Sequence, residues 1–294
     1  MSTTTDTAPP TTPPRRRRRV SRGDLAMQAG LAFIALPWIV VPVWLLVVNS
    51  LKSYEEASLL DLSLPSEWRF DNYATVFEEG NYGMGLFNSL VIALPTLATV
   101  IVFGSMAAWA FARSQRVSMK IAYNMSVLSI LLPPAILPTI YELQVLGIDG
   151  SRLGYYLVLV GTRLGVVVFL ATGFVRAMSP DIEEAAAIDG ASKPQIYRLL
   201  ILPSLLPVLL VGGVILIITI WNEFLFALFL LRGGERATLP LGLFRFASAA
   251  PEVASFRWDL VFAHVTLTSL PIVIVYFFVQ RRLVQGLSEG AVKG

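Results

Sequence analysis

The chain has 294 residues, of which 55% are hydrophobic and 15% are charged, and its formal net charge at pH 7 is +3. With a mean hydropathy of +0.67, it is too apolar for an ordinary soluble domain and is typical of a protein that crosses a membrane several times. The absence of cysteine excludes disulfides and thiolate chemistry, and the single histidine excludes most zinc sites.

Residues 1–24 form a tail that is expected to be disordered, because its first part is rich in Thr and Pro. Arg15 to Arg19, with Arg22, form a basic block. Such a block can bind nucleic acid, but beside a membrane span it more often sets topology and touches anionic lipid. The apolar run that follows is too long for a signal-peptide h-region and lacks a small-residue cleavage site. The sequence therefore predicts an uncleaved first transmembrane helix over 25–50.

Six segments are long and apolar enough to cross about 30 Å of hydrocarbon as helices. They are Met27–Val48, Leu86–Ala112, Ile121–Leu143, Tyr155–Val175, Pro203–Leu231 and Trp258–Gln280. Pro133, Pro134 and Pro138 are expected to bend or break the third of them, and Gly212–Gly213 to loosen the fifth. The pattern predicts an all-α membrane protein with six transmembrane helices. The lack of an internal repeat weakens a secondary transporter built from inverted repeats.

The distribution of basic residues predicts the orientation of the chain. Of the 23 Lys and Arg residues, 15 lie in the N-terminal tail, in the loops 113–120 and 176–202, and in the C-terminal end. By the positive-inside rule, these segments and both termini are cytoplasmic. The acidic segment 51–85 then lies outside and is long enough to form a subdomain. Residues 86–282 form a core with the other five spans, and 283–294 form a cytoplasmic tail.

The longest cytoplasmic interruption, residues 179–207, predicts two short helices joined by a tight turn. Ser179 and Pro180 suit the start of the first helix, and Gly190 can end it in a left-handed conformation. Ser192 opens a capping box with Gln195 at the start of the second helix.

Pro203 is expected to end that second helix or to begin the next element. On the first helix, Ala185 and Ala186 share one face with Ile182 and Asp189. A surface of alanines lets another protein pack closely. The hairpin is therefore either a solvated link between two spans or a docking element.

No sequence motif supports catalysis by this chain alone. The nucleotide-binding pattern GxxxxGK[ST] is absent, as are GxSxG and HExxH. Polar residues inside spans are the remaining signal, because they are costly there and normally face a partner or a cavity. Asn222 and Glu223 are candidates for contact with a solute, and an ion pair of Glu223 with Arg163 is the structural alternative. His264 is expected to be a hydrogen-bonded packing residue.

Several motifs resemble known transporter subunits. Glu184-Ala185-Ala186, Asp189-Gly190-Ala191 and Leu202-Pro203 resemble the EAA loop of ABC importer permeases. Phe70-Asp71-Asn72-Tyr73, Phe87-Asn88-Ser89, Trp221-Asn222-Glu223-Phe224 and the C-terminal Gly290-Ala291-Val292-Lys293-Gly294 resemble the second, six-span permease of maltose-type carbohydrate importers. The resemblance covers nearly all of the chain after residue 30.

This resemblance implies a type I ABC importer permease in the cell (inner) membrane. Its partners would be a homologous second permease subunit, two ATPase subunits and an extracytoplasmic sugar-binding protein, with no nucleic acid. ATP and Mg would be bound by the ATPase, and this chain would hold no cofactor or metal. The resemblance assigns contact with the ATPase to the loop residues Glu184, Ala185, Ala186, Asp189, Gly190 and Ala191.

In this loop Glu184 would offer a carboxylate to a basic group on the ATPase, and Gly290 to Gly294 would also reach that interface. In this family the companion permease can carry most solute contacts. Asn88, Asn222 and Glu223 are therefore candidates only for lining the pore.

Three other functions remain open at this point. One is an ABC permease for a different solute, such as glycerol-phosphate, a polyol or an amino acid, because the EAA loop does not discriminate between solutes. A second is an ion-coupled secondary transporter with Glu223 and Arg163 as its relay, and a third is a structural membrane subunit.

Overall fold

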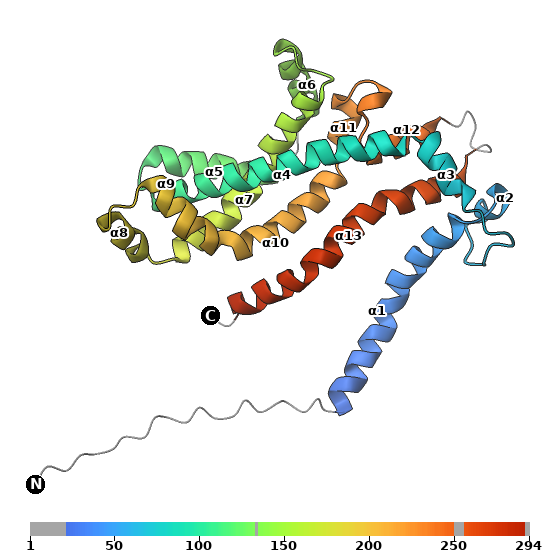
Figure 1. Ribbon diagram of the computed structural model, residues 1–294, viewed down its shortest axis with the longest axis horizontal. Coiled ribbons are helices and arrows are strands. Elements are labelled where there is room, and N and C mark those ends of the chain that lie inside the picture. Colours follow the sequence, from blue (N-terminus) through green and yellow to red (C-terminus); the bar gives the residue numbers. More distant parts are fainter. Residues whose placement is uncertain (1–21, 133–134, 250–255, 292–294) are drawn as a thin grey trace, which may run out of the picture. The chain divides into compact units, whose positions relative to one another are not determined.

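The computed structural model describes residues 22–132, 135–249 and 256–291. Within these ranges all regular secondary structure is helical (Figure 1). The chain divides into two compact units, Met1–Leu45 and Leu46–Gly294. Most of α1 (Arg22–Asn49) belongs to the first unit. All its side chains from 27 to 44 are exposed, and most are apolar, as expected of a helix that faces lipid. Residues 1–21 of the predicted tail lie outside the described ranges.

The second unit is a helical bundle centred on α4 (Tyr82–Arg113), α7 (Arg152–Ala177) and α10 (Leu202–Trp221), with α5 (Val117–Leu131) and α13 (Trp258–Ala291) packed around them. Buried apolar residues of the central three helices form the core, including Val100, Leu159 and Leu205. Small residues let the backbones approach closely. A Cβ atom on Gly104 of α4 would lie only 2.8 Å from the side chain of Val167 on α7.

The six predicted spans correspond to five long apolar helices and one bent pair. The five are Met27–Asn49, Tyr82–Arg113, Arg152–Ala177, Lys193–Trp221 and Trp258–Phe278. The pair is α5 and α6 (Ile136–Val145), between which the chain bends by 119°, as in a broken span or a re-entrant loop. The predicted break of the third span is confirmed, although Pro133 and Pro134 lie outside the described residues. Pro138 is not at the break but in the first turn of α6, where proline is tolerated.

The prediction that Pro203 begins the next element is confirmed, because it is the second residue of α10. The helix is continuous from α9 (Lys193–Ile196) through a π-helical turn, η1 (Tyr197–Ile201), into α10. A proline ring in a helix presses on the carbonyl four residues earlier, and the wider π turn relieves that contact. At Gly212–Gly213, where the sequence predicts a looser helix, α10 is uninterrupted and both glycines are buried.

At the end of the second unit that lies away from α9 (Figure 1), the segment 51–85 folds into α2 (Tyr54–Ala57), α3 (Asp71–Glu78) and the start of α4. The side chain of Asn72 donates hydrogen bonds to the carbonyls of Ser50 at 3.0 Å and Lys52 at 2.9 Å. Lys52 is fully buried; its ammonium pairs with the carboxylate of Asp61 and donates to Asn49 Oδ1 at 3.2 Å. The two Asn72 bonds satisfy backbone carbonyls of the chain directly after α1.

Candidate functional site

The hairpin predicted from sequence is present, although Pro180 is the N-cap of its first helix and not the first helical residue. Ser179 Oγ accepts from the Asp181 N–H at 3.3 Å, and α8 spans Asp181–Ile188, with Pro180 immediately before it. Gly190 has φ of +85°, the left-handed conformation that the turn requires. The Ser192 N–H donates to Gln195 Oε1 at 2.8 Å, which confirms the capping box.

Three α4 residues at four-residue spacing, Ser105, Trp109 and Arg113, form a stripe, and the last two attach α8 to the bundle. Arg113 Nε and Nη2 donate to Glu183 Oε1 at 2.9 and 2.7 Å. Trp109 Nε1 donates to the other carboxylate oxygen at 2.8 Å. Arg113 Nη2 also donates to the Met178 carbonyl at 3.1 Å. Residues four apart lie on one helix face, so this α4 stripe presents a single surface to the hairpin.

The same α4 stripe holds the second arm of the hairpin. The hydroxyls of Ser105 and Tyr197 share a hydrogen bond of 2.7 Å, and both residues are buried. The rings of Trp109 and Tyr197 have centroids 6.0 Å apart. Tyr197 begins the π-helical turn, a feature that is often found at functional sites. Both arms of the hairpin are therefore fixed to one face of α4.

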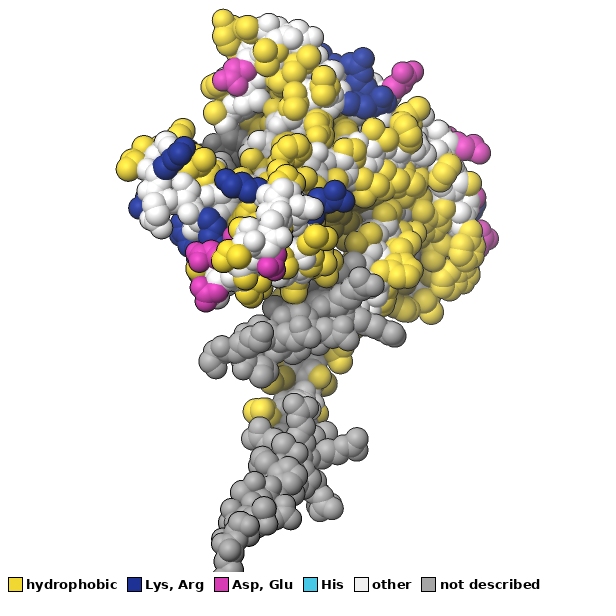
Figure 2. All heavy atoms as spheres, turned by 60° about the vertical axis from the view of Figure 1, so that its left-hand side comes forward, with side chains coloured by type: hydrophobic (Ala, Val, Ile, Leu, Met, Phe, Trp, Pro, Cys, Tyr) yellow, Lys and Arg dark blue, Asp and Glu magenta, His cyan; other side chains and the backbone are white. Residues whose placement is uncertain are grey.

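The outer surface of the hairpin combines acidic and apolar groups. Glu184, Ala185, Asp189 and Gly190 are exposed, whereas Ala186 and Ala191 pack partly against the core. Large apolar side chains are exposed beside them: Ile182 (57%), Ile188 (86%) and Leu199 (70%). Figure 2 shows charged side chains gathered where the hairpin comes forward, next to a flank of hydrophobic ones. Exposed apolar groups surrounded by polar ones are typical of a protein interaction surface.

Reasoning from sequence missed Glu183 as the residue that fixes the hairpin. Its place in the first turn of α8 is explained by the helix dipole alone, which favours acidic residues there. Arg113 at the end of a span was the available signal, because a cation there needs a nearby acceptor. Two consecutive glutamates on a helix point in different directions, and here Glu183 faces α4 while the Glu184 side chain is exposed.

The prediction that Asn222 and Glu223 lie inside a continuous fifth span is wrong. The structure ends α10 at Trp221 and places both residues between α10 and α11 (Leu225–Leu230). Glu223 Oε1 accepts from the Phe226 N–H at 2.9 Å, which caps α11, and Asn222 Nδ2 donates back to the Ile218 carbonyl at 2.9 Å. These bonds satisfy backbone groups at the break, so the chain can turn there.

The structure confirms the interhelical ion pair that was the structural alternative for Glu223. Arg163 Nη2, near the middle of α7, donates to Glu223 Oε2 at 2.7 Å. The Arg163 side chain is 25% exposed and that of Glu223 is 11% exposed. A partly buried pair of this kind replaces an isolated charge, which would be far more costly within a membrane span.

Asn88 is fully buried, and its side chain holds two parts of the backbone together. Its amide donates to the carbonyls of Glu235 and Ala237 at 2.8 and 2.9 Å. The neighbouring Ser89 Oγ accepts from the Leu239 N–H at 2.9 Å. These bonds tie α4 to the chain between η2 (Gly234–Arg236) and α12 (Leu239–Ser248). The structure therefore does not bring Asn88 together with Asn222 and Glu223 in one polar site.

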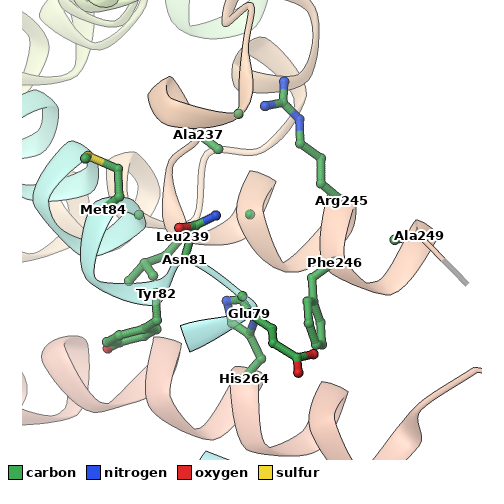
Figure 3. Close-up of a pocket in the computed structure, with 14 residues that line it drawn as sticks. Glu79, Asn81, Tyr82, Met84, Ala237, Leu239, Arg245, Phe246, Ala249 and His264 are labelled. Atoms are coloured by element: carbon green, nitrogen blue, oxygen red, sulfur yellow. The ribbon is translucent and has the colours of Figure 1, made fainter. Parts of the chain in front are cut away.

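His264 lines a cavity of about 240 Å³ between the α3–α4 junction, α12 and α13. Its ring lies between those of Tyr82 and Phe246, with centroids 6.2 and 5.8 Å away (Figure 3). It is a buried packing residue, as predicted. The predicted hydrogen bond is wrong, because neither ring nitrogen has a partner among the residues that the structure describes.

A family model described as "Binding-protein-dependent transport system inner membrane component" matches residues 100–289. The probable starch degradation products transport system permease protein AmyC of Thermoanaerobacterium thermosulfurigenes is 34% identical over 268 residues, covering 88% of this chain and 93% of that protein. The diacetylchitobiose uptake system permease protein NgcG of Streptomyces coelicolor is 29% identical over 254 residues, covering 86% and 83%.

The fold is similar to that of a chain in the crystal structure of a bacterial ABC transporter involved in the import of the acidic polysaccharide alginate. The TM-score is 0.75 at 22% identity, and the match covers 89% of this chain and 98% of that one. The all-helical fold predicted for an ABC importer permease is thereby confirmed.

Proposed function

Because the chain belongs to the family of binding-protein-dependent transport system inner membrane components, we propose that it is a permease subunit of an ATP-driven importer for a sugar or oligosaccharide. It forms half of the translocation pore, and a homologous second permease forms the other half. Two ATPase subunits bind ATP and Mg²⁺, and an extracytoplasmic binding protein delivers the solute. This chain contributes no catalytic residue.

The observation that carries this proposal is the hairpin, whose inner face is bound to α4 and whose outer face is exposed. The Glu183 contacts with Arg113 and Trp109 hold α8 against the bundle. The adjacent Glu184 remains exposed beside Ile182 and Ile188. A rigid element with a free acidic and apolar surface suits a contact with a separate motor protein. The ATPase state would then bias two arrangements of the bundle through this contact, with no reactive residue in this chain.

A saccharide is the solute class that the relatives support. AmyC is described as transporting starch degradation products and NgcG diacetylchitobiose, both of which are carbohydrates. The C-terminal motif that resembles the sugar branch agrees with them. A permease for glycerol-phosphate, a polyol or an amino acid is the alternative, and solute binding by the cognate binding protein distinguishes the two.

The proposed orientation places the hairpin and both termini in the cytoplasm. The described end of α13 lies toward the same end of the second unit as the hairpin, and α2 and α3 lie at the other end (Figure 1). This arrangement agrees with the positive-inside rule applied to the loops. Single cysteines in the 113–120 loop and in α3 would test it, because they should be labelled from opposite sides of the membrane.

Glu184→Lys and Gly190→Leu test the coupling role. Lysine reverses the charge offered to the ATPase, and leucine is strained at φ of +85°. Both variants should insert into the membrane yet lose coupling between ATP hydrolysis and sugar uptake. Gly173→Leu, on the exposed side of α7 where a Cβ meets nothing within 4 Å, controls for added bulk. Unchanged uptake by both hairpin variants would refute this role.

An ion-coupled transporter predicts a different response to energy sources. Uptake would survive inactivation of the ATPase and collapse with the ion gradient. The proposed importer should behave in the opposite way, losing uptake when the ATPase is inactivated.

A further inference from the structure

A second cavity, of about 160 Å³, lies beside the break between α10 and α11. It is bordered by α5, α7 and α11, and its polar lining residues are Ser129, Thr162 and Arg163. Phe226 supplies an aromatic side chain to the same lining. The cavity therefore combines hydroxyl groups, a guanidinium and apolar surface, and it borders α7, one of the three central helices of the bundle.

The guanidinium of Arg163 is only partly used by the protein. Its Nη2 donates to Glu223, but its Nε is buried and has no hydrogen-bond partner among the described residues. An arginine has five N–H donors in a fixed fork, and a buried donor without an acceptor is costly. The cavity is a place where a ligand hydroxyl could accept a hydrogen bond from the guanidinium N–H groups that are exposed and that Glu223 does not use.

The charge of this site is already cancelled within the protein. Glu223 accepts from Arg163 with one carboxylate oxygen and from the Phe226 N–H with the other. The hydroxyls of Thr162 and Ser129 donate to helix carbonyls at 2.9 and 2.7 Å, which leaves their oxygen lone pairs as acceptors. The wall thus offers donors and acceptors without net charge, next to an aromatic surface. Neutral saccharides present the matching groups, which are hydroxyls around an apolar ring face.

We propose that this cavity contacts the transported solute and that its internally paired charge favours neutral saccharides over uronates. The inference rests on the proposed function and specifies the solute class. A carboxylated sugar would meet an arginine whose charge Glu223 already balances, so it would gain little in exchange for its lost hydration. Glu223 thereby acts on specificity through Arg163.

The lack of cysteine in the chain allows a direct test of access and charge. Thr162→Cys in the full transporter complex is treated with two thiosulfonate reagents, one carrying a sulfonate and the other a trimethylammonium group. Both should label Thr162→Cys, and maltotriose presented with its binding protein should slow the labelling several-fold. Phe169→Cys, an exposed apolar position on the same helix, is the control and should react much more slowly.

Glu223→Gln then tests the role of the paired charge. Glutamine keeps an oxygen for the Phe226 N–H but leaves Arg163 unbalanced. The ratio of sulfonate to ammonium labelling at Thr162→Cys should rise by about tenfold, because a nearby unpaired cation attracts the anionic reagent. Asp149→Asn removes an equal charge from the pair with Arg232, at 2.9 Å, and should leave the ratio unchanged.

Three results would overturn the inference: no labelling at Thr162→Cys, no protection by maltotriose, or a labelling ratio that Glu223→Gln leaves unchanged. Sugar uptake by the parent complex is measured in parallel. If uptake is present in any of these cases, the solute-contact site is refuted while the importer function stands. If the parent complex takes up no sugar, the proposed function itself fails, and with it the saccharide assignment.

Discussion

Arg113 and Glu183, which are 70 residues apart in the chain, are joined by two hydrogen bonds to one carboxylate oxygen, at 2.9 and 2.7 Å. Both side chains are largely buried. Removing one partner of such a pair leaves the other charge without compensation. The pair therefore makes the position of α8 depend on α4. It also gives adjacent glutamates different roles, because Glu183 binds α4 and Glu184 stays exposed.

Replacing Glu183 by alanine should release α8 from the bundle. Arg113 and Trp109 lose their shared acceptor, and the expected cost is about 1.5–3 kcal/mol, the usual range for hydrogen bonds to a charged group. Limited proteolysis of the purified protein in detergent should show faster cleavage in residues 179–202. Glu184→Ala is the matched control, because its side chain is exposed, and it should not change the cleavage rate. Equal cleavage of the two variants would contradict the role assigned to Glu183.

The buried hydrogen bond between Ser105 and Tyr197 should be detectable as an energetic coupling. Tyr197→Phe and Ser105→Ala each remove one of the two hydroxyls. A double-mutant cycle should give a coupling of about 0.5–1.5 kcal/mol, because the two groups are buried and in contact. Denaturant-induced unfolding in detergent provides the measurement. Strictly additive effects would mean that the hydroxyls do not interact.

Two glycines on α7 should respond oppositely to alanine. A Cβ atom on Gly165 would lie 2.2 Å from the Ser126 carbonyl oxygen and 2.6 Å from Ser129 Oγ. Gly165→Ala must push α5 away from α7 and should cost about 1–3 kcal/mol. Gly161→Ala meets nothing within 4 Å, and helix propensity alone favours it by up to about 1 kcal/mol. Thermal unfolding of the isolated chain should therefore separate the two variants, and equal melting temperatures would refute the close approach.

The segment 51–85 should lose stability in acid through Asp61. Hydrogen bonds from Lys52 and from Ser63 lower the pKa of Asp61 below its ordinary value of 3.8. A carboxyl group with a lowered pKa stabilises the folded state above its unfolded pKa, and that contribution is lost as the pH falls through the folded pKa. Hydrogen exchange in this segment should therefore increase below about pH 4.

Asp61→Asn isolates that contribution from the other carboxyl groups. The variant should exchange faster than the wild type at neutral pH, because the buried Lys52 loses its counter-charge. The difference between the two proteins should shrink as the pH falls. A difference that is independent of pH would show that the Lys52–Asp61 pair does not control the segment.

His264→Leu should not destabilise the isolated chain and could stabilise it by about 1–3 kcal/mol. Leucine fills part of the same space and removes two ring nitrogens that have no partner among the described residues. Thermal unfolding compares the variant with wild type. A large loss of stability would indicate that His264 is hydrogen-bonded after all.

Features set by local sequence were predictable. Length and hydropathy indicated where the spans lie, and the positions of Gly190 and Ser192 indicated the turn and the cap, because these signals act within a few residues. The Arg163–Glu223 pair was also foreseeable, since two opposite charges inside apolar spans have few other partners.

Features that depend on contacts distant in sequence were not predictable in the same way. Apolar residues continue past Trp221, so hydropathy alone extended the fifth span. The structure stops it because Glu223 caps α11 and binds Arg163. The α4 stripe was also not predicted, because no local sequence pattern relates Arg113 to Glu183, which lies 70 residues further along the chain. The assignment of Glu184, Ala185, Ala186, Asp189, Gly190 and Ala191 to the ATPase contact remains a prediction.

The uninterrupted helix from Lys193 to Trp221 has a mechanical consequence. Tyr197 ties it to α4 near one end, and its other end lies next to the Asn222–Glu223 break. At 1.5 Å per residue, Trp221 is roughly 36 Å from Tyr197. A tilt of about 5° around that tie would move the far end by roughly 3 Å, for a much smaller movement of α9. If the helix tilts as a rigid body about that tie, a small displacement at the hairpin would become a larger one at the polar break.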